Sequence, residues 1–201
     1  MKIKFLTGLL MTGLLLAAGP YARAQDTAID LGAADAAAKW GFSDTTARIE
    51  EGALLLDGRQ TPAKAFYLPL EWGDVVLQAR FYVEPQEEGV KACGFVVRAR
   101  DAATYYFVHY DKGQAILCRS TAGNAWIEIM RAGNLVKPAG EWHEGRFEIA
   151  GDTLRVSLNG ELLYEAQDNT LDQGRIGFYA GQGRERYRRQ RRFRTRERPI
   201  Q

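Results

Sequence analysis

The stretch from Leu154 to Gly181, LRVSLNGELLYEAQDNTLDQGRIGFYAG, decides the fold class of this chain. Asn159-Gly160 lies between two apolar-rich runs, and this dipeptide favours a type I′ hairpin turn because both central residues need φ > 0. The turn predicts that Val156 pairs with Leu163 and Ser157 with Leu162. A strand that begins at a glycine and is interrupted by another, GRIGFY, follows later in the stretch. The stretch therefore predicts an antiparallel β-protein, and it names no reaction.

Strand-like runs punctuated by turn residues fill most of the chain after Trp40. We expect strands at 48–50, 53–57, 64–69, 74–83, 92–99, 104–110, 114–119, 125–130, 144–150, 153–158, 161–165 and 174–180. Many short strands with regular turns are typical of a sandwich or jelly roll. The sequence therefore predicts one all-β domain, a two-sheet antiparallel jelly-roll sandwich over residues 40–183, after a lead-in segment at 25–39.

The N-terminal segment 1–24 has the pattern of a secretory signal peptide. Lys2 and Lys4 precede an apolar run at 5–18, and an A-x-A sequence at 22–24 fits a cleavage site. The apolar run is too short and too interrupted by glycine for a membrane anchor. We therefore expect no membrane span and a protein that is secreted or periplasmic once this segment is removed.

Charge divides the rest of the chain into two unequal parts. Residues 25–183 carry 15 Lys and Arg against 23 Asp and Glu, whereas residues 184–201 carry nine Arg and two Glu. The acidic body argues against a nucleic-acid-binding surface, so no specific nucleic-acid recognition is expected.

The arginine-rich segment 184–201 has four interpretations. Arg184–Arg198 could bind polyanions such as acidic polysaccharides, or could clamp the acidic body of its own chain. A divergent last strand could run through Tyr187–Arg194 with its arginines at a solvated edge. The segment could also be an out-of-frame translation.

The two cysteines are expected as free, buried thiols. In the expected strand register, Cys93 and Cys118 lie about 16 Å apart along the strand direction, and a disulfide needs Cα atoms within roughly 7 Å. The two histidines, His109 and His143, show no metal-ligand spacing with these cysteines. We therefore expect neither a metal nor a cofactor.

A meander between residues 92 and 130 offers a candidate site. Turns centred near Ala102, Lys112 and Ala122 place Val97 level with Phe107 on a core face. The opposite face then combines aromatic and charged side chains: Arg98, Tyr106, Tyr110, Trp126 and Glu128. Aromatic faces cover the C–H patches of sugars, while Arg and Glu hydrogen-bond their hydroxyls, so this face is a candidate carbohydrate-binding platform. The alternative is that these side chains cover a half-exposed sheet.

Catalytic residues cannot be assigned from the sequence. His109 lies on the predicted core face, and we expect it to be a structural histidine with its hydrogen bonds satisfied. We expect His143 to be a surface or packing residue. Glu141, Glu144 and Glu148 cluster without the E-x-D-x-x-E run of a paired-carboxylate glycosidase. Asp168 and Asp172 are expected to cap a loop. No G-x-S-x-G, P-loop or HExxH motif is present.

An ordered series of short motifs resembles a known superfamily. The series is Gly94–Arg98 (GFVVR), Tyr105–Val108 (YYFV), Glu141–His143 (EWH), Val156–Gly160 (VSLNG) and Gly174–Phe178 (GRIGF). In this order the motifs resemble the concanavalin A-like lectin/glucanase superfamily. Within it, residues from Trp40 to Gly181 are most similar to the bacterial 3-keto-disaccharide hydrolase (glycoside hydrolase-like) domains and to laminin-G-like jelly rolls.

The resemblance implies a jelly roll whose concave sheet handles carbohydrate, with Arg98 on that concave face. It also implies a closing strand, for which the matching residues are Arg192–Thr195. The acidic run of laminarinase-type glucanases is absent, which argues against classical glycosidase activity. We expect an exported domain that binds or processes a saccharide, and its enzymatic version is a glycoside-cleaving hydrolase. The alternative is a non-catalytic cell-envelope interaction module with a polyanion-binding tail.

Overall fold

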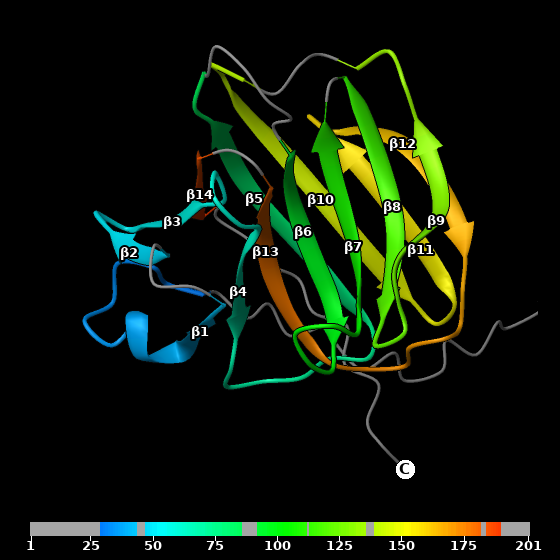
Figure 1. Cartoon of the computed structure of the whole chain (residues 1–201), viewed down its shortest axis with the longest axis horizontal. Coiled ribbons are helices and arrows are strands. Elements are labelled where there is room, and N and C mark those ends of the chain that lie inside the picture. The colour runs from blue at the N-terminus through cyan, green and yellow to red at the C-terminus, as the bar shows by residue number, and fades with distance from the viewer. Residues whose placement is uncertain are drawn as a thin grey trace, which may run out of the picture.

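The computed structural model describes residues 29–43, 47–85, 92–111, 113–135, 139–181 and 184–189. Over these residues the chain forms two seven-stranded antiparallel sheets and one short 3-10 helix, η1 (Ala37–Lys39). The sheets stack face to face and enclose the hydrophobic core (Figure 1). The predicted all-β jelly-roll sandwich is confirmed.

The sheet nearer the viewer in Figure 1 is called the front sheet here, and the other the back sheet. The front sheet has the strand order β1 (Trp40–Phe42), β4 (Ala63–Tyr67), β13 (Arg175–Gly181), β6 (Ala92–Ala99), β7 (Tyr105–Asp111), β8 (Gln114–Thr121) and β9 (Asn124–Ala132). The back sheet has the order β12 (Glu161–Gln167), β11 (Thr153–Leu158), β10 (Trp142–Ala150), β5 (Val75–Val83), β14 (Arg184–Arg189), β3 (Ala53–Asp57) and β2 (Arg48–Glu50). None of the helices in the described ranges is both long and apolar enough to span a membrane.

The hairpin that decided the fold class forms as predicted between β11 and β12. Asn159 and Gly160 have φ values of 52° and 86°, as a type I′ turn requires. Ser157 pairs with Leu162 as predicted, but Val156 pairs with Tyr164 rather than with Leu163, because the register shifts by one residue between Val156 and Ser157. The Asn159 side chain also accepts a hydrogen bond from the Glu144 backbone N–H at 2.9 Å, which ties the turn to β10.

Strand β14 is an interior strand of the back sheet, between β5 and β3. Its Tyr187 is fully buried, and the Tyr187 hydroxyl donates to the Tyr179 carbonyl at 2.6 Å and accepts from the Gly94 N–H at 3.0 Å. The structure places a strand at 184–189, whereas Arg192–Thr195, for which the resemblance implied a closing strand, lie outside the described ranges. The strand is central rather than an edge because both of its neighbours bond to it.

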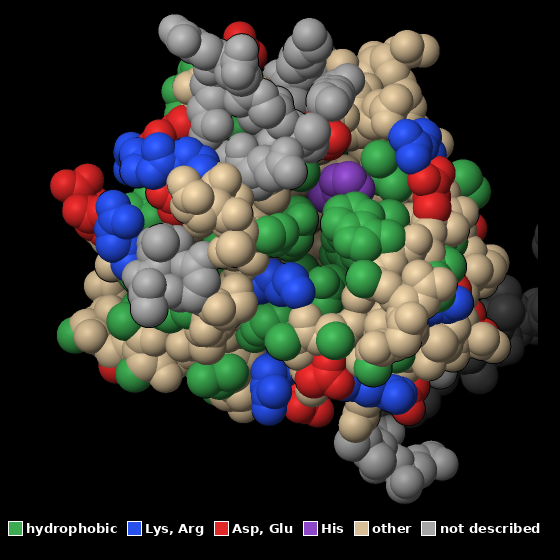
Figure 2. Space-filling model, viewed as in Figure 1, with side chains coloured by type: hydrophobic (Ala, Val, Ile, Leu, Met, Phe, Trp, Pro, Cys, Tyr) green, Lys and Arg blue, Asp and Glu red, His purple; other side chains and the backbone are tan. Residues whose placement is uncertain are grey.

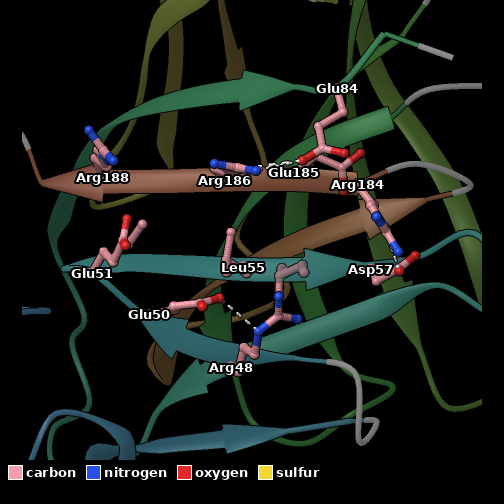
Figure 3. Close-up of a pocket in the computed structure, with 12 residues that line it drawn as sticks. Arg48, Glu50, Glu51, Leu55, Asp57, Glu84, Arg184, Glu185, Arg186 and Arg188 are labelled. Atoms are coloured by element: carbon pink, nitrogen blue, oxygen red, sulfur yellow. Dashed lines mark hydrogen bonds and ion pairs between the residues drawn. The ribbon is translucent and has the colours of Figure 1, made fainter.

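The outward-facing arginines of β14 contact acidic groups of their own chain (Figure 3), and one of them also contacts an aromatic ring. Arg184 pairs with Asp57 at 2.8 Å, and Arg186 pairs with Glu84 at 3.0 Å. The Arg188 guanidinium lies 5.3 Å from the ring centroid of Trp142. This part of the segment follows two of the four interpretations, a last strand and a clamp on the acidic body. Polyanion binding stays a prediction, and residues 190–201 lie outside the described ranges.

The two cysteines are free and buried, as predicted. Cys93 belongs to the core between the sheets, whereas Cys118 lies on the outer side of the front sheet. Burial raises the pKa of the Cys118 thiol to about 12.

Glu185 is an unpaired carboxyl inside the sandwich. It alternates with the exposed Arg184 and Arg186, is 1% exposed, and neither oxygen has a hydrogen-bond partner among the described residues. Burial, together with the nearby carboxylates of Asp57 and Glu84, raises the pKa of Glu185 well above its ordinary value. The side chain is consequently protonated in the folded protein under conditions where it ionises in the unfolded chain.

Replacing Glu185 by Gln is expected to stabilise the protein increasingly as pH rises. Above the ordinary glutamate pKa, wild type loses up to about 1.4 kcal/mol of unfolding free energy per pH unit, because only its unfolded state releases this proton. Near pH 4 the two proteins are expected to be alike, because Glu185 is then protonated in both states. Urea unfolding at about pH 4, 6 and 8 measures the difference, with the exposed Glu161→Gln as control. A gain independent of pH would contradict the assignment.

Candidate functional site

Strand β7 presents the face opposite to the one predicted. Val97 pairs with Tyr106 rather than with Phe107. Tyr106 and Tyr110 therefore point into the core between the sheets, at 0% and 1% exposure, while Phe107 and His109 lie on the outer side of the front sheet. The predicted faces of β8 and β9 agree with the structure, as do those of Phe95, Val96 and Val97 in β6, so the differences are confined to β7 and to Arg98 at the end of β6.

Local turn geometry causes this one-residue difference. The Asp101 carboxylate accepts hydrogen bonds from the Ala103 and Thr104 N–H groups, both at 2.7 Å, and this fixes the loop before β7. Gly113, with a φ of 78°, fixes the turn after it. A displacement of one residue in register reverses the direction of every side chain in a strand.

The inward tyrosines find hydrogen-bond partners inside the sandwich. The Tyr106 hydroxyl donates to Asp168 at 2.5 Å and accepts from the Leu171 N–H at 3.0 Å. The Tyr110 hydroxyl donates to the Ser157 carbonyl at 3.1 Å. Burial raises the pKa of Tyr106 to about 12, so it remains a neutral donor. Both rings anchor the core rather than a ligand-facing surface.

Arg98 is a buried connection between loops. Its φ of 49° turns the side chain away from the outer face, and the residue is 3% exposed. Its guanidinium donates to the carbonyls of Gly73 at 2.8 Å, Leu171 at 2.6 Å and Gly151 at 2.8 Å. Asp74 lies at 3.7 Å and balances the charge. The expected placement of Arg98 on a carbohydrate-facing surface is therefore wrong.

The five residues of the predicted platform do not share one surface. Trp126 and Glu128 lie on the outer side of the front sheet as expected, whereas Arg98, Tyr106 and Tyr110 are enclosed. A role for Trp126 and Glu128 in binding stays a prediction.

The outer side of the front sheet carries a different set of aromatic side chains, called here the aromatic face: Phe66, Tyr105, Phe107, Trp126 and Tyr179. Phe107 is central, because its ring centroid lies 4.9 Å from Trp126, 5.4 Å from Tyr105 and 5.8 Å from Tyr179. Figure 2 looks onto this side of the molecule and shows hydrophobic side chains gathered around its hollowed centre. These rings come from four strands of the front sheet, β4, β13, β7 and β9.

A hollow of about 400 Å³ opens on this face between β4, β13, β7 and the β8–β9 turn. Aromatic and small polar groups line it: Tyr105, Trp126, Tyr179, Lys64, Ser120, Thr121 and Asn124, with Pro62 and the alanines and glycine of the adjoining turns. Lys64 donates to the Ala102 carbonyl at 2.9 Å, and its ammonium lies 4.8 Å from the Tyr105 ring centroid. The described lining residues include no Asp or Glu.

Charged and titratable groups adjoin the Trp126 edge of the hollow. Glu128 is bound by Arg131 through contacts of 2.5 and 3.0 Å, and this ion pair lowers the pKa of the Glu128 carboxyl. His109 contacts Trp126, with ring centroids 5.1 Å apart, and burial lowers the pKa of His109 to about 4. His109 has no hydrogen-bond partner for either ring nitrogen among the described residues. The expectation of a satisfied core histidine is therefore wrong.

The other residues considered from the sequence lie elsewhere. His143 is buried on β10, where its Nδ1 lies 3.1 Å from the Asn159 side chain. Glu144 and Glu148 belong to the back sheet. Asp168 accepts a hydrogen bond from the Thr170 N–H at 2.9 Å, and Asp172 pairs with Arg100 at 2.7 Å. Both aspartates thus hold the loop before β13, as predicted.

Comparison with known families assigns the chain to one protein family. Residues 30–194 match the 3-keto-alpha-glucoside-1,2-lyase-like domain family. The chain belongs to this family, and the match includes the central strand β14. No curated protein sequence matches the chain.

Solved structures share the fold at low sequence identity. A carbohydrate-binding module, CBM66 from Bacillus subtilis, superposes with a TM-score of 0.63 at 16% identity, covering 75% of this chain and 92% of its own. A β-glucanase from Bacillus licheniformis gives 0.61 at 10% identity, covering 86% and 98%. A Bacillus subtilis protein of unknown function with a galectin-like fold gives 0.64 at 13% identity, covering 86% and 97%. These similarities confirm a concanavalin A-like jelly roll.

Replacing Arg98 by Ala is expected to lower the free energy of unfolding by about 3–5 kcal/mol. Three carbonyl groups lose their donor, and Asp74 loses the cation beside it. Urea denaturation measures the loss. The control is Arg100→Ala, which breaks an exposed ion pair with Asp172 and is expected to cost at most about 1 kcal/mol. Equal effects of the two substitutions would contradict the structural role of Arg98.

Proposed function

We propose that the protein is a saccharide-binding domain whose ligand lies in the hollow of the aromatic face. The observation that carries this proposal is the composition of the lining, in which three aromatic rings adjoin Lys64 and small polar groups. Rings of this kind cover the apolar faces of sugars, and the polar groups hydrogen-bond hydroxyls. Family membership and the carbohydrate-binding module among the similar structures support the proposal.

The charge of the lining favours binding over hydrolysis by paired acids. That reaction uses two carboxyl groups about 5–10 Å apart that flank the scissile bond. The described lining offers no carboxylate, and the adjacent Glu128 is held as an anion by Arg131. A protonated acid and a partner carboxylate are thus not assembled among these residues.

The proposal includes the location of the protein. The signal-peptide pattern of residues 1–24 supports export, which would bring the hollow into contact with saccharides outside the cytoplasm. The free, buried cysteines are compatible with an oxidising compartment, because neither thiol is accessible for pairing.

Replacing Trp126 by Ala is expected to weaken saccharide binding at least tenfold, which corresponds to about 1.4 kcal/mol. Trp126 is 53% exposed and lines the hollow, so its indole offers a surface on which a sugar ring can stack. A glycan array, followed by calorimetric titration of methyl α-glucoside and its 3-keto derivative, measures the change. The matched control is Leu162→Ala, an equally exposed apolar side chain (55%) on β12 of the back sheet. Equal binding by both variants would contradict this location of the site.

Cleavage of 3-keto-α-glucosides is a second candidate function, which the family assignment favours. A ketone at C3 acidifies the C2–H bond, so removal of that proton and departure of the C1 oxygen substituent leave a C1=C2 double bond. We expect the protein to release nitrophenol from a nitrophenyl 3-keto-α-glucoside faster than buffer does, and not from the unoxidised glucoside. Absorbance measures the release. A rate equal to that in buffer, with binding retained, would leave the domain a binding module.

A further inference from the structure

His109 is a buried polar side chain on the aromatic face whose ring nitrogens are unused. It is 5% exposed, and neither Nδ1 nor Nε2 has a hydrogen-bond partner among the described residues. Its ring stacks on Phe107 with centroids 5.8 Å apart and meets Trp126 edge to face at 5.1 Å. A buried polar group without a partner costs roughly 1–3 kcal/mol, so its presence requires an explanation.

Packing does not supply that explanation. A phenylalanine ring could occupy the same place between Phe107 and Trp126 without leaving nitrogen atoms unpaired. The second histidine differs at one nitrogen: Nε2 of the buried His143 also has no partner among the described residues, but its Nδ1 lies 3.1 Å from the Asn159 side chain. The hydrogen-bonding capacity of the His109 ring nitrogens is therefore not used by the described residues of the fold.

The surroundings hold His109 in its neutral form. Burial is the main cause of the pKa of about 4, the cation of Arg131 lowers it further, and Glu128 opposes this with a smaller effect. Both charged groups are on β9 and are paired with each other. At neutral pH the ring thus carries one N–H donor and one acceptor nitrogen, which matches the donor and acceptor of a sugar hydroxyl.

Trp126 connects His109 to the hollow. Its indole contacts the His109 ring on one side and lines the hollow on the other. More than half of the Trp126 side chain is exposed, so there is room on the solvent side for another rotamer. Such a change would open a path from the hollow to the ring nitrogens.

We infer that His109 is a specificity-determining residue of the saccharide site, which binds a hydroxyl of a neutral sugar once Trp126 turns aside. This inference rests on the proposed function and deepens it. It predicts that His109 lowers the stability of the free protein and that its hydrogen bond to the sugar stabilises the complex. The saccharide must present a free hydroxyl at the Trp126 end of the hollow, because a hydroxyl can accept from the ring N–H or donate to the other ring nitrogen.

The variant His109→Phe separates binding from folding. It is expected to weaken binding of methyl α-glucoside at least tenfold while the melting temperature stays equal or rises, because the substitution removes two unpaired nitrogens and retains the ring. A histidine with only a structural role would give the reverse pattern, with unchanged affinity and a lower melting temperature. Calorimetric titration and thermal unfolding on the same samples measure both quantities.

A second measurement uses the wild-type protein and does not depend on the variant folding. The chain has two histidines, so ring ¹⁵N signals can be assigned with His143 as the internal reference. Addition of methyl α-glucoside is expected to shift the ring-nitrogen signals of His109 and leave those of His143 unchanged. Unmoved His109 signals at saturation would overturn the inference.

The two levels of the proposal fail in different ways. Wild-type affinity in His109→Phe, together with weak binding in Trp126→Ala, overturns the role of His109 and retains the site. Absence of binding of methyl α-glucoside and its 3-keto derivative to the wild-type protein overturns both.

Discussion

The buried guanidinium of Arg98 fixes the end of the sandwich on which the aromatic face depends. It binds three carbonyls, from Gly73 before β5, Gly151 between β10 and β11, and Leu171 before β13. These segments are distant in sequence, and hydrogen bonds to a charged donor are stronger than neutral ones. Because β13 supplies Tyr179 to the hollow, the position of that ring depends on the loop that Arg98 and Tyr106 hold. Arg98 therefore acts on the site through the fold.

The opposite side of β13 is held by the back sheet. Tyr187 of β14 crosses the core and bonds to the backbone of both β13 and β6, through Tyr179 and Gly94. The strand that carries this tyrosine is rich in arginine, which is unusual for the centre of a sheet. It is accommodated because the arginines alternate outward and bind Asp57, Glu84 and Trp142. The acidic excess of the body thus has a structural use, and the basic end of the chain is in part its counterpart.

Most strands could be predicted from the sequence because they are short apolar runs between turn residues, and the Asn159-Gly160 hairpin formed as expected. Strand β1 was not expected, and β14 is rich in arginine rather than apolar. The inward face of β7 could not be predicted, because both faces of Tyr105–Asp111 carry apolar as well as polar side chains. When both faces are compatible with burial, register depends on the turns. The bonds of Asp101 and the φ of Gly113 decided it, and pattern alone contains neither. The one-residue difference in register placed Phe107 and His109, rather than Tyr106 and Tyr110, on the outer side of the front sheet.

The same exchange explains why the site is aromatic and poor in carboxylates. Tyr106 and Tyr110 have hydroxyls that find acceptors inside the sandwich, so the inner position satisfies them. Phe107 needs no partner and serves as the base of the outer rings, whereas His109 is left with nitrogen atoms that no neighbouring described residue meets. An outer surface built for solvent alone would gain nothing from a buried imidazole under an exposed indole. A ligand with both hydroxyls and an apolar face uses the two together, and a saccharide has this combination.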